Sequence, residues 1–108
     1  MADSTLPTSC DVLIRGADLI DGSGAPRRRA DVAVTDDRVV ALGDLAQVSA
    51  GRMIDASGLV LAPGFIDVHT HDDFALLNTP EMTPKVSQGV TTVVVGNCGV
   101  SLAPLVLG

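Results

Sequence analysis

The chain has 108 residues, within the range of one small domain, and 46% of them are hydrophobic, as is typical of a globular protein. Only 2% are aromatic, so an apolar core has to be built from Val, Leu, Ile and Ala. The formal net charge of −6 argues against a nucleic-acid partner, because phosphate binding needs clustered cations.

Residues 1–10 are small and polar, and we expect them to form a flexible N-terminus. They lack the basic start and apolar run of a secretory signal, and no apolar stretch approaches the roughly 18 residues that cross a bilayer. We therefore expect a cytoplasmic protein without a membrane partner. The single basic run, residues 27–29, lies among acids and is interpreted as a solvated loop, with a binding patch as the alternative.

Residues 11–62 consist of short β-branched runs separated by turn residues. This pattern predicts strands near 11–20, 30–42 and 53–61, with the turn of a hairpin at Asp36-Asp37. The last range forms either a strand pair or a bend, because Gly58 interrupts it. We interpret the region as the N-terminal part of a small β-domain, either a small sheet or half a sandwich.

The pattern changes at Pro63-Gly64. Residues 65–71 and 91–95 are strands by composition, and we expect them to form a parallel pair near 65–70 and 91–96. Between them, residues 79–89 favour a helix that begins at Thr83, because Pro84 would interrupt an earlier start. A strand, a helix and a parallel strand predict an α/β unit.

The strongest local signal for chemistry is Asp67-Val68-His69-Thr70-His71-Asp72-Asp73. Side chains alternate along a strand, so His69 and His71 are expected on one side, near the carboxyl end of the strand, where parallel α/β folds build their active sites. Two such imidazoles are well placed to share a metal ion. The alternative is two ordinary surface histidines. We favour the metal site, since these are the only histidines in the chain and follow a Pro-Gly turn.

The second signal is Gly96-Asn97-Cys98-Gly99, again at the end of an apolar strand. If both strands belong to one barrel, Cys98 faces the same rim as the histidines, and thiolate with imidazole is a zinc-binding combination. By itself Cys98 is more typical of a small buried apolar residue, but together with the histidines we favour a ligand. Cys10 has no such setting and is interpreted as structural or incidental.

The two acids that follow the histidines, Asp72 and Asp73, have two interpretations. They orient an imidazole by hydrogen bonding, or they form a solvated or helix-capping pair.

The segment from Pro63 to His71 resembles the first-strand signature of the amidohydrolase superfamily, whose members are metal-dependent (β/α)8 barrels preceded by part of a small β-sandwich domain. Residues 84–99, together with His71-Asp72-Asp73, resemble the D-aminoacylase subgroup, the N-acyl-D-amino-acid deacylases. The resemblance implies an N-terminal part of the small β-domain at 11–62 and a truncated first βαβ portion of the catalytic barrel at 63–108.

The resemblance further implies a Zn²⁺ site, with His69 and His71 at a more weakly held metal and Cys98 at the tight zinc, where it also bridges. The implied reaction is hydrolysis of an N-acyl-D-amino acid to a carboxylate and a D-amino acid by a zinc-activated water. No catalytic residue is expected in this chain, because the general-base aspartate lies further along in such enzymes. The remainder of the parent chain would then be needed for a complete fold and for activity.

Two alternatives remain open. One is another amidohydrolase, such as a cyclic-amide hydrolase of the dihydroorotase or hydantoinase type, which usually bridges two metals through a carboxylated lysine. The other is a non-catalytic β-domain that binds metal without turnover, or binds none. If the second is correct, metal analysis of the purified chain will find no stoichiometric zinc.

Overall fold

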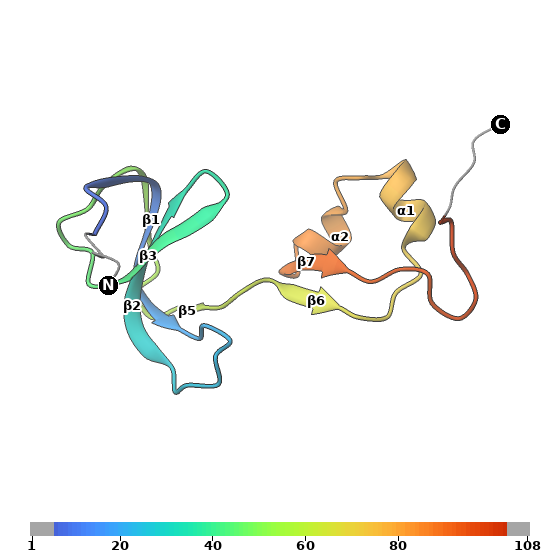
Figure 1. The fold of residues 1–108 in the computed structure, drawn as a ribbon, viewed down its shortest axis with the longest axis horizontal. Helices are drawn as coiled ribbons and strands as arrows, with labels where there is room; N and C mark the ends of the chain where they lie inside the picture. Colours follow the sequence, from blue (N-terminus) through green and yellow to red (C-terminus); the bar gives the residue numbers. More distant parts are fainter. Residues whose placement is uncertain (1–5, 104–108) are drawn as a thin grey trace, which may run out of the picture. The chain divides into compact units, whose positions relative to one another are not determined.

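A computed structural model describes residues 6–103, and the expectation of a flexible segment at residues 1–5 lies outside them. The chain divides into two compact units, Met1–Pro63 and Gly64–Gly108 (Figure 1). Among residues 6–103, no helix is both long enough and apolar enough to cross a membrane.

The first unit is a five-stranded mixed sheet with the order β3-β2-β1-β4, in which β5 also pairs with β1. The strands are β1 (Ser9–Leu19), β2 (Arg28–Thr35), β3 (Arg38–Gly43), β4 (Ser49–Asp55) and β5 (Val60–Leu61). Strands β2 and β3 form the expected antiparallel hairpin, and Asp36 in its turn has a positive φ of 51°. Strand β1 begins at Ser9, inside the segment expected to be flexible.

Strands β4 and β5 both run parallel to β1 and do not pair with each other. Of the two possibilities for residues 53–61, the bend is therefore correct, although β4 begins four residues earlier, at Ser49. The long central strand carries a bulge between Ile14 and Ala17 on its other edge. Gly16 lies in the bulge with φ of 70°, and a Cβ atom there would lie 2.9 Å from the Ser57 hydroxyl.

The two faces of the first sheet carry separate apolar clusters, because neighbouring side chains of a strand point to opposite faces. One cluster consists of Cys10, Leu13, Ala33, Leu45 and Val48. The other consists of Leu19, Ala30 and Val32, with Ile14, Val34 and Leu61 packed against it. The second cluster borders an open apolar concavity of about 400 Å³. Apart from Cys10, aliphatic residues form both clusters, as the low aromatic content predicts.

The second unit contains β6 (Phe65–Asp67), α1 (Asp73–Asn78), α2 (Thr83–Val86) and β7 (Val90–Val93). Strands β6 and β7 pair in parallel, and both helices lie on the segment that connects them (Figure 1). The predicted parallel pair and the α/β class are therefore confirmed.

Two details of the second unit differ from the prediction. Strand β6 ends at Asp67, so His69 and His71 follow the strand and do not lie on it. The helix expected over 79–89 is reduced to the single turn α2, while α1 forms earlier, from Asp73. The sequence of α1, DFALLN, supplies good helix formers and an acidic first residue, whereas Pro80 and Pro84 restrict the later segment.

Candidate metal centre

The loop with both histidines is held by the backbone of the neighbouring strand. The Val94 amide donates to the Asp67 carbonyl at 2.8 Å, and the Thr70 amide donates to the Val94 carbonyl at 3.4 Å. Thr70 is thereby drawn into the unit and is only 7% exposed, while His69 and His71 on either side of it are exposed. The two imidazoles share one side because the buried threonine between them points inward.

Cys98 lies in a turn after β7 whose backbone is left-handed at three positions. The φ angles are 80° at Gly96, 54° at Cys98 and 77° at Gly99, a region that glycine tolerates and other residues rarely adopt. The Asn97 side chain secures this turn by donating to the Val94 carbonyl at 2.7 Å and to the Thr70 carbonyl at 3.2 Å. Asn97 thus ties the cysteine turn directly to the residue between the two histidines.

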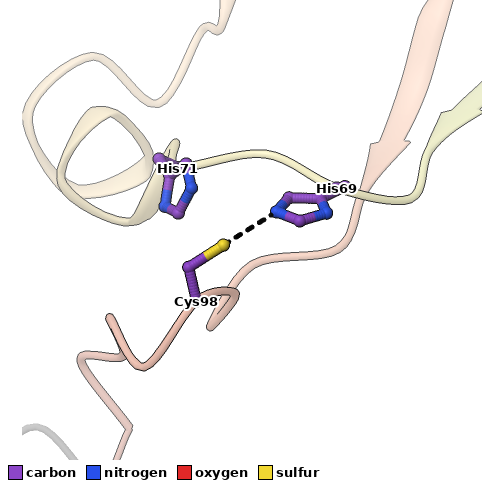
Figure 2. Close-up of side chains that lie close together, drawn as sticks. All are labelled: His69, His71 and Cys98. Carbon is purple, nitrogen blue, oxygen red and sulfur yellow. Dashed lines mark hydrogen bonds between the residues drawn. The ribbon is translucent and has the colours of Figure 1, made fainter.

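The structure brings the three predicted ligands together. Nε2 of His69 lies 3.2 Å from Sγ of Cys98, and one ligand atom from each of His69, His71 and Cys98 can be chosen so that all lie within 4.8 Å of one another. The imidazole centroids are 5.7 Å apart, and the Cys98 sulfur points toward the His69 ring, with the His71 ring nearby (Figure 2). Ligands of a tetrahedral zinc are about 3.3–3.6 Å apart, given its usual bond lengths. The side chains therefore need only small rotations to meet one ion.

The donor set also fits zinc chemically, because two imidazoles and a thiolate are borderline-to-soft ligands. Within residues 6–103 this is the one group of three or more histidine, cysteine or acidic side chains placed to share an ion. Cys98 is exposed, which does not fit the alternative of a small buried apolar residue. Cys10 is buried in the apolar core of the first unit, in agreement with a structural role.

A polar network lies directly behind the histidine loop. The Lys85 ammonium, from α2, donates to Asp67 Oδ2 at 2.6 Å and to the Thr70 hydroxyl at 3.3 Å, and forms an ion pair with Asp72 Oδ2 at 3.0 Å. The Thr70 hydroxyl donates to the same Asp72 oxygen at 2.6 Å. The second Asp67 oxygen accepts the backbone N–H of His69 at 3.3 Å. One lysine therefore connects three residues that alternate with the two histidines.

The network shifts the titration of its members. The Lys85 hydrogen bond lowers the pKa of the Asp67 carboxyl. The Thr70 hydroxyl first, and then Lys85, lower the pKa of Asp72. In return, hydrogen bonds to Asp67 and then Asp72 raise the pKa of the Lys85 ammonium. All three groups are thus held in their charged forms.

Neither interpretation of the acid pair describes what the structure shows. Asp72 accepts from Thr70 and Lys85, and none of its described contacts is to an imidazole; it makes no side-chain capping bond to α1. Asp73 is only 5% exposed, and its Oδ2 has no hydrogen-bond partner among the described residues. Asp72 supports the histidine loop through its neighbour, whereas Asp73 is buried instead of solvated.

Sequence reasoning missed the supporting residues Lys85, Thr70 and Asn97. One signal pointed to Lys85, because it is the only lysine of the chain and the only Lys or Arg after Arg52. A lone cation in a segment that contains five acids is well supplied with partners. Thr70 and Asn97 carry no comparable signal, since their roles depend on a backbone path that periodicity does not reveal.

Comparison with known proteins identifies the family. The model of the amidohydrolase family matches residues 52–106, just over half of the chain. The chain belongs to the amidohydrolase family.

Three individual proteins are similar to the chain over most of its length. The N-acyl-D-aspartate deacylase of Alcaligenes xylosoxydans xylosoxydans is 64% identical over 99 residues, which cover 92% of this chain and 20% of that protein. A D-aminoacylase of the same organism is 63% identical, covering 88% of this chain and 20% of the relative. The third is the N-acyl-D-glutamate deacylase from Bordetella bronchiseptica, whose crystal structure contains zinc and a phosphonate inhibitor that mimics the tetrahedral intermediate. It is 56% identical to this chain with a TM-score of 0.84, and the match covers 92% of this chain and 21% of that protein. The chain therefore spans about a fifth of the length of the relatives it matches.

Proposed function

We propose that the protein to which this chain belongs is a zinc-dependent hydrolase of N-acyl-D-amino acids, and that His69, His71 and Cys98 bind its metal. The observation that carries the proposal is the convergence of these three side chains, with ligand atoms within 4.8 Å of one another. The similarity of the whole segment to three deacylases supports the substrate class.

We infer that the two units belong to different domains of the complete protein. Unit Met1–Pro63 forms the N-terminal part of a small β-domain, and unit Gly64–Gly108 forms the first βαβ portion of a catalytic barrel. The parallel pairing of β6 with β7 supports this inference, because a closed barrel of this kind is built from such pairs. The ligands follow the carboxyl ends of both strands, where barrel active sites lie.

This chain's own contribution is to hold the donor atoms. Zinc, when bound, lowers the pKa of a coordinated water toward neutrality and polarises the substrate carbonyl. The left-handed turn at Cys98 and the buried Thr70 bring the thiol and the imidazoles near one another, which supports a shared ion. The general-base aspartate and the contacts to the substrate carboxylate would come from outside this chain, so the chain alone is expected to be inactive.

The proposal is tested with the complete protein that contains these residues. Purified with zinc, it should release carboxylate and D-amino acid from N-acetyl-D-amino acids, and leave the L-enantiomers intact. A panel of neutral and acidic D-side chains is needed, since the matched relatives are named for aspartate, for glutamate and for D-amino acids in general. Opening of a hydantoin ring with no action on linear amides would favour the cyclic-amide alternative instead.

Metal analysis separates the deacylase from a non-catalytic domain that binds no metal, and the turnover assay above separates it from one that binds metal without turnover. We expect stoichiometric zinc in the complete protein and its loss in Cys98→Ala. His69→Ala should act more mildly, because the family resemblance assigns this residue to the weaker metal. A wild-type zinc content in Cys98→Ala would show that the thiol is not a ligand and would remove the central support for the proposal.

We also propose a cytoplasmic location. Cys98 is exposed and both cysteines are free thiols. A thiolate ligand has to stay reduced, and the reducing cytoplasm preserves it. Recovery of the protein from outside the cytoplasm, with Cys98 oxidised, would contradict the proposed location.

A further inference from the structure

The lysine behind the histidine loop has no role in the function proposed above. Lys85 reaches Asp67, Thr70 and Asp72, each of which is adjacent in sequence to a histidine or two residues from one. It comes from α2, 13 or more residues further along the chain. Its side chain is only 24% exposed, so the ammonium is partly enclosed by its partners.

We propose that Lys85 is a positioning residue for the metal centre, which holds His69 and His71 in the geometry that binds zinc. The inference rests on the proposed metal site at His69, His71 and Cys98. Lys85 does not touch the ligand atoms; it acts by fixing the backbone between and beside them.

The contacts explain how a single ammonium does this. One oxygen of Asp67 accepts a hydrogen bond from the Lys85 ammonium and the other accepts one from the His69 amide. Asp67 therefore fixes the backbone position of His69 where the chain leaves β6. Asp72 forms an ion pair with Lys85 and accepts a hydrogen bond from the Thr70 hydroxyl. These two contacts fix the direction of the backbone after His71. Without the ammonium, two carboxylates that both lie within 3.0 Å of it would repel each other and spread the loop.

A positioning role and a purely electrostatic role predict opposite signs. A cation near a metal ion disfavours a second positive charge, so removing Lys85 would tighten zinc binding if its charge were all that mattered. If Lys85 instead pre-organises the ligands, its removal weakens binding. Loss of a group that orients metal ligands typically costs about 10–100-fold in metal affinity.

The test measures zinc affinity of the apoprotein, in the complete protein, by competition with a chromophoric chelator. Lys85→Met should weaken zinc binding about tenfold or more, while Lys85→Arg, which keeps the charge and the donors, should restore most of it. Arg38→Met is the matched control, because it removes an exposed cation whose ion pair with Asp37 lies in the first unit, with side chains 81% and 85% exposed. The visible spectrum of the Co²⁺-substituted protein should change in Lys85→Met and not in Arg38→Met.

A second variant covers the possibility that Lys85→Met does not fold. Lys85→Met combined with Asp67→Asn removes one positive and one negative charge, so the field at the metal changes little while the tether is still lost. It should bind zinc about tenfold more weakly than wild type.

The outcomes separate this inference from the proposed function. Zinc binding in Lys85→Met, or in the double variant, that equals or exceeds wild type overturns the positioning role and leaves the metal site standing. Absence of zinc from wild type, or its retention in Cys98→Ala, overturns the metal site and the inference with it.

Discussion

The two units of this chain are stabilised by different kinds of contact. All the buried hydrophobic side chains among residues 6–103 lie in the first unit, between Cys10 and Ala56. In the second unit the buried residues are polar, Thr70 and Asp73, while large apolar side chains such as Phe65 and Phe74 are each 63% exposed. The first unit is stabilised by a hydrophobic core, whereas the second is organised by backbone pairing and a charged network.

Within the described part of the second unit, the loop with the two histidines is held by polar contacts. Hydrophobic burial has no direction, but hydrogen bonds to named atoms set position and orientation. The segment around His69 and Cys98 is fixed by such bonds, and its apolar surface remains available to further parts of the protein. A strained turn and an exposed donor set are therefore supported by polar contacts rather than by packing.

The largest expected effect follows from separating the two units. Residues 1–63 should unfold cooperatively on heating, with marginal stability, because a unit of about 60 residues buries only some 60% of its surface. Residues 64–108 should show no cooperative transition, and should bind dyes specific for exposed apolar surface. Circular dichroism and dye fluorescence measure this. A cooperative thermal transition of the isolated second unit would contradict the conclusion that only the first unit has a hydrophobic core.

The two cysteines give the next contrast, since one lies in each unit. Cys98→Ala should abolish tight zinc binding in the complete protein and reduce turnover more than about 100-fold, beyond the usual effect of losing an outer partner. Cys10→Ala should leave zinc content unchanged and lower stability, because Cys10 is only 7% exposed in the core. Metal analysis and thermal melting distinguish them. Equal effects of both substitutions would contradict the division between core and site.

Truncating one apolar residue in each unit compares packing directly. Leu13 is fully buried, so Leu13→Ala should lower the free energy of unfolding of the 108-residue chain by about 2–5 kcal/mol. Phe74→Ala should change it by no more than about 0.5 kcal/mol, because Phe74 is exposed. The measurement is chemical denaturation. Repeating Phe74→Ala in the complete protein sharpens the comparison, since a loss there of about 3–5 kcal/mol would mean that other parts cover this side chain.

A smaller effect on zinc binding than that of Cys98→Ala is expected at the link between the histidine loop and the cysteine turn. Asn97→Ala removes the bonds to the Val94 and Thr70 carbonyls and should weaken zinc binding by about tenfold. Gln88→Ala is the control, because among residues 6–103 its side-chain amide bonds the Pro84 carbonyl, away from the three candidate ligands. Both affinities are measured by chelator competition. If the control weakens binding as much as Asn97→Ala, the loss reflects general loosening of the second unit.

The sequence by itself determined the elements and the chemistry of the donors. Alternating β-branched runs predicted the hairpin of β2 and β3, and the apolar runs around a helical segment predicted the parallel pair of β6 and β7. These are local properties, set by side-chain shape and by a few turn residues. The candidate ligands, His69, His71 and Cys98, followed from the same local patterns, and the structure brings these three side chains together.

Only the tertiary structure decided how the three candidate ligands converge. Strand alternation predicted the two imidazoles on one side for the wrong reason, since β6 ends at Asp67 and the inward turn of Thr70 produces the arrangement. The Lys85 contacts join residues 13–18 positions apart, and the Asn97 bond to Thr70 joins residues 27 positions apart. Such contacts depend on how separate segments fold back on each other, and no periodicity in the chain encodes them.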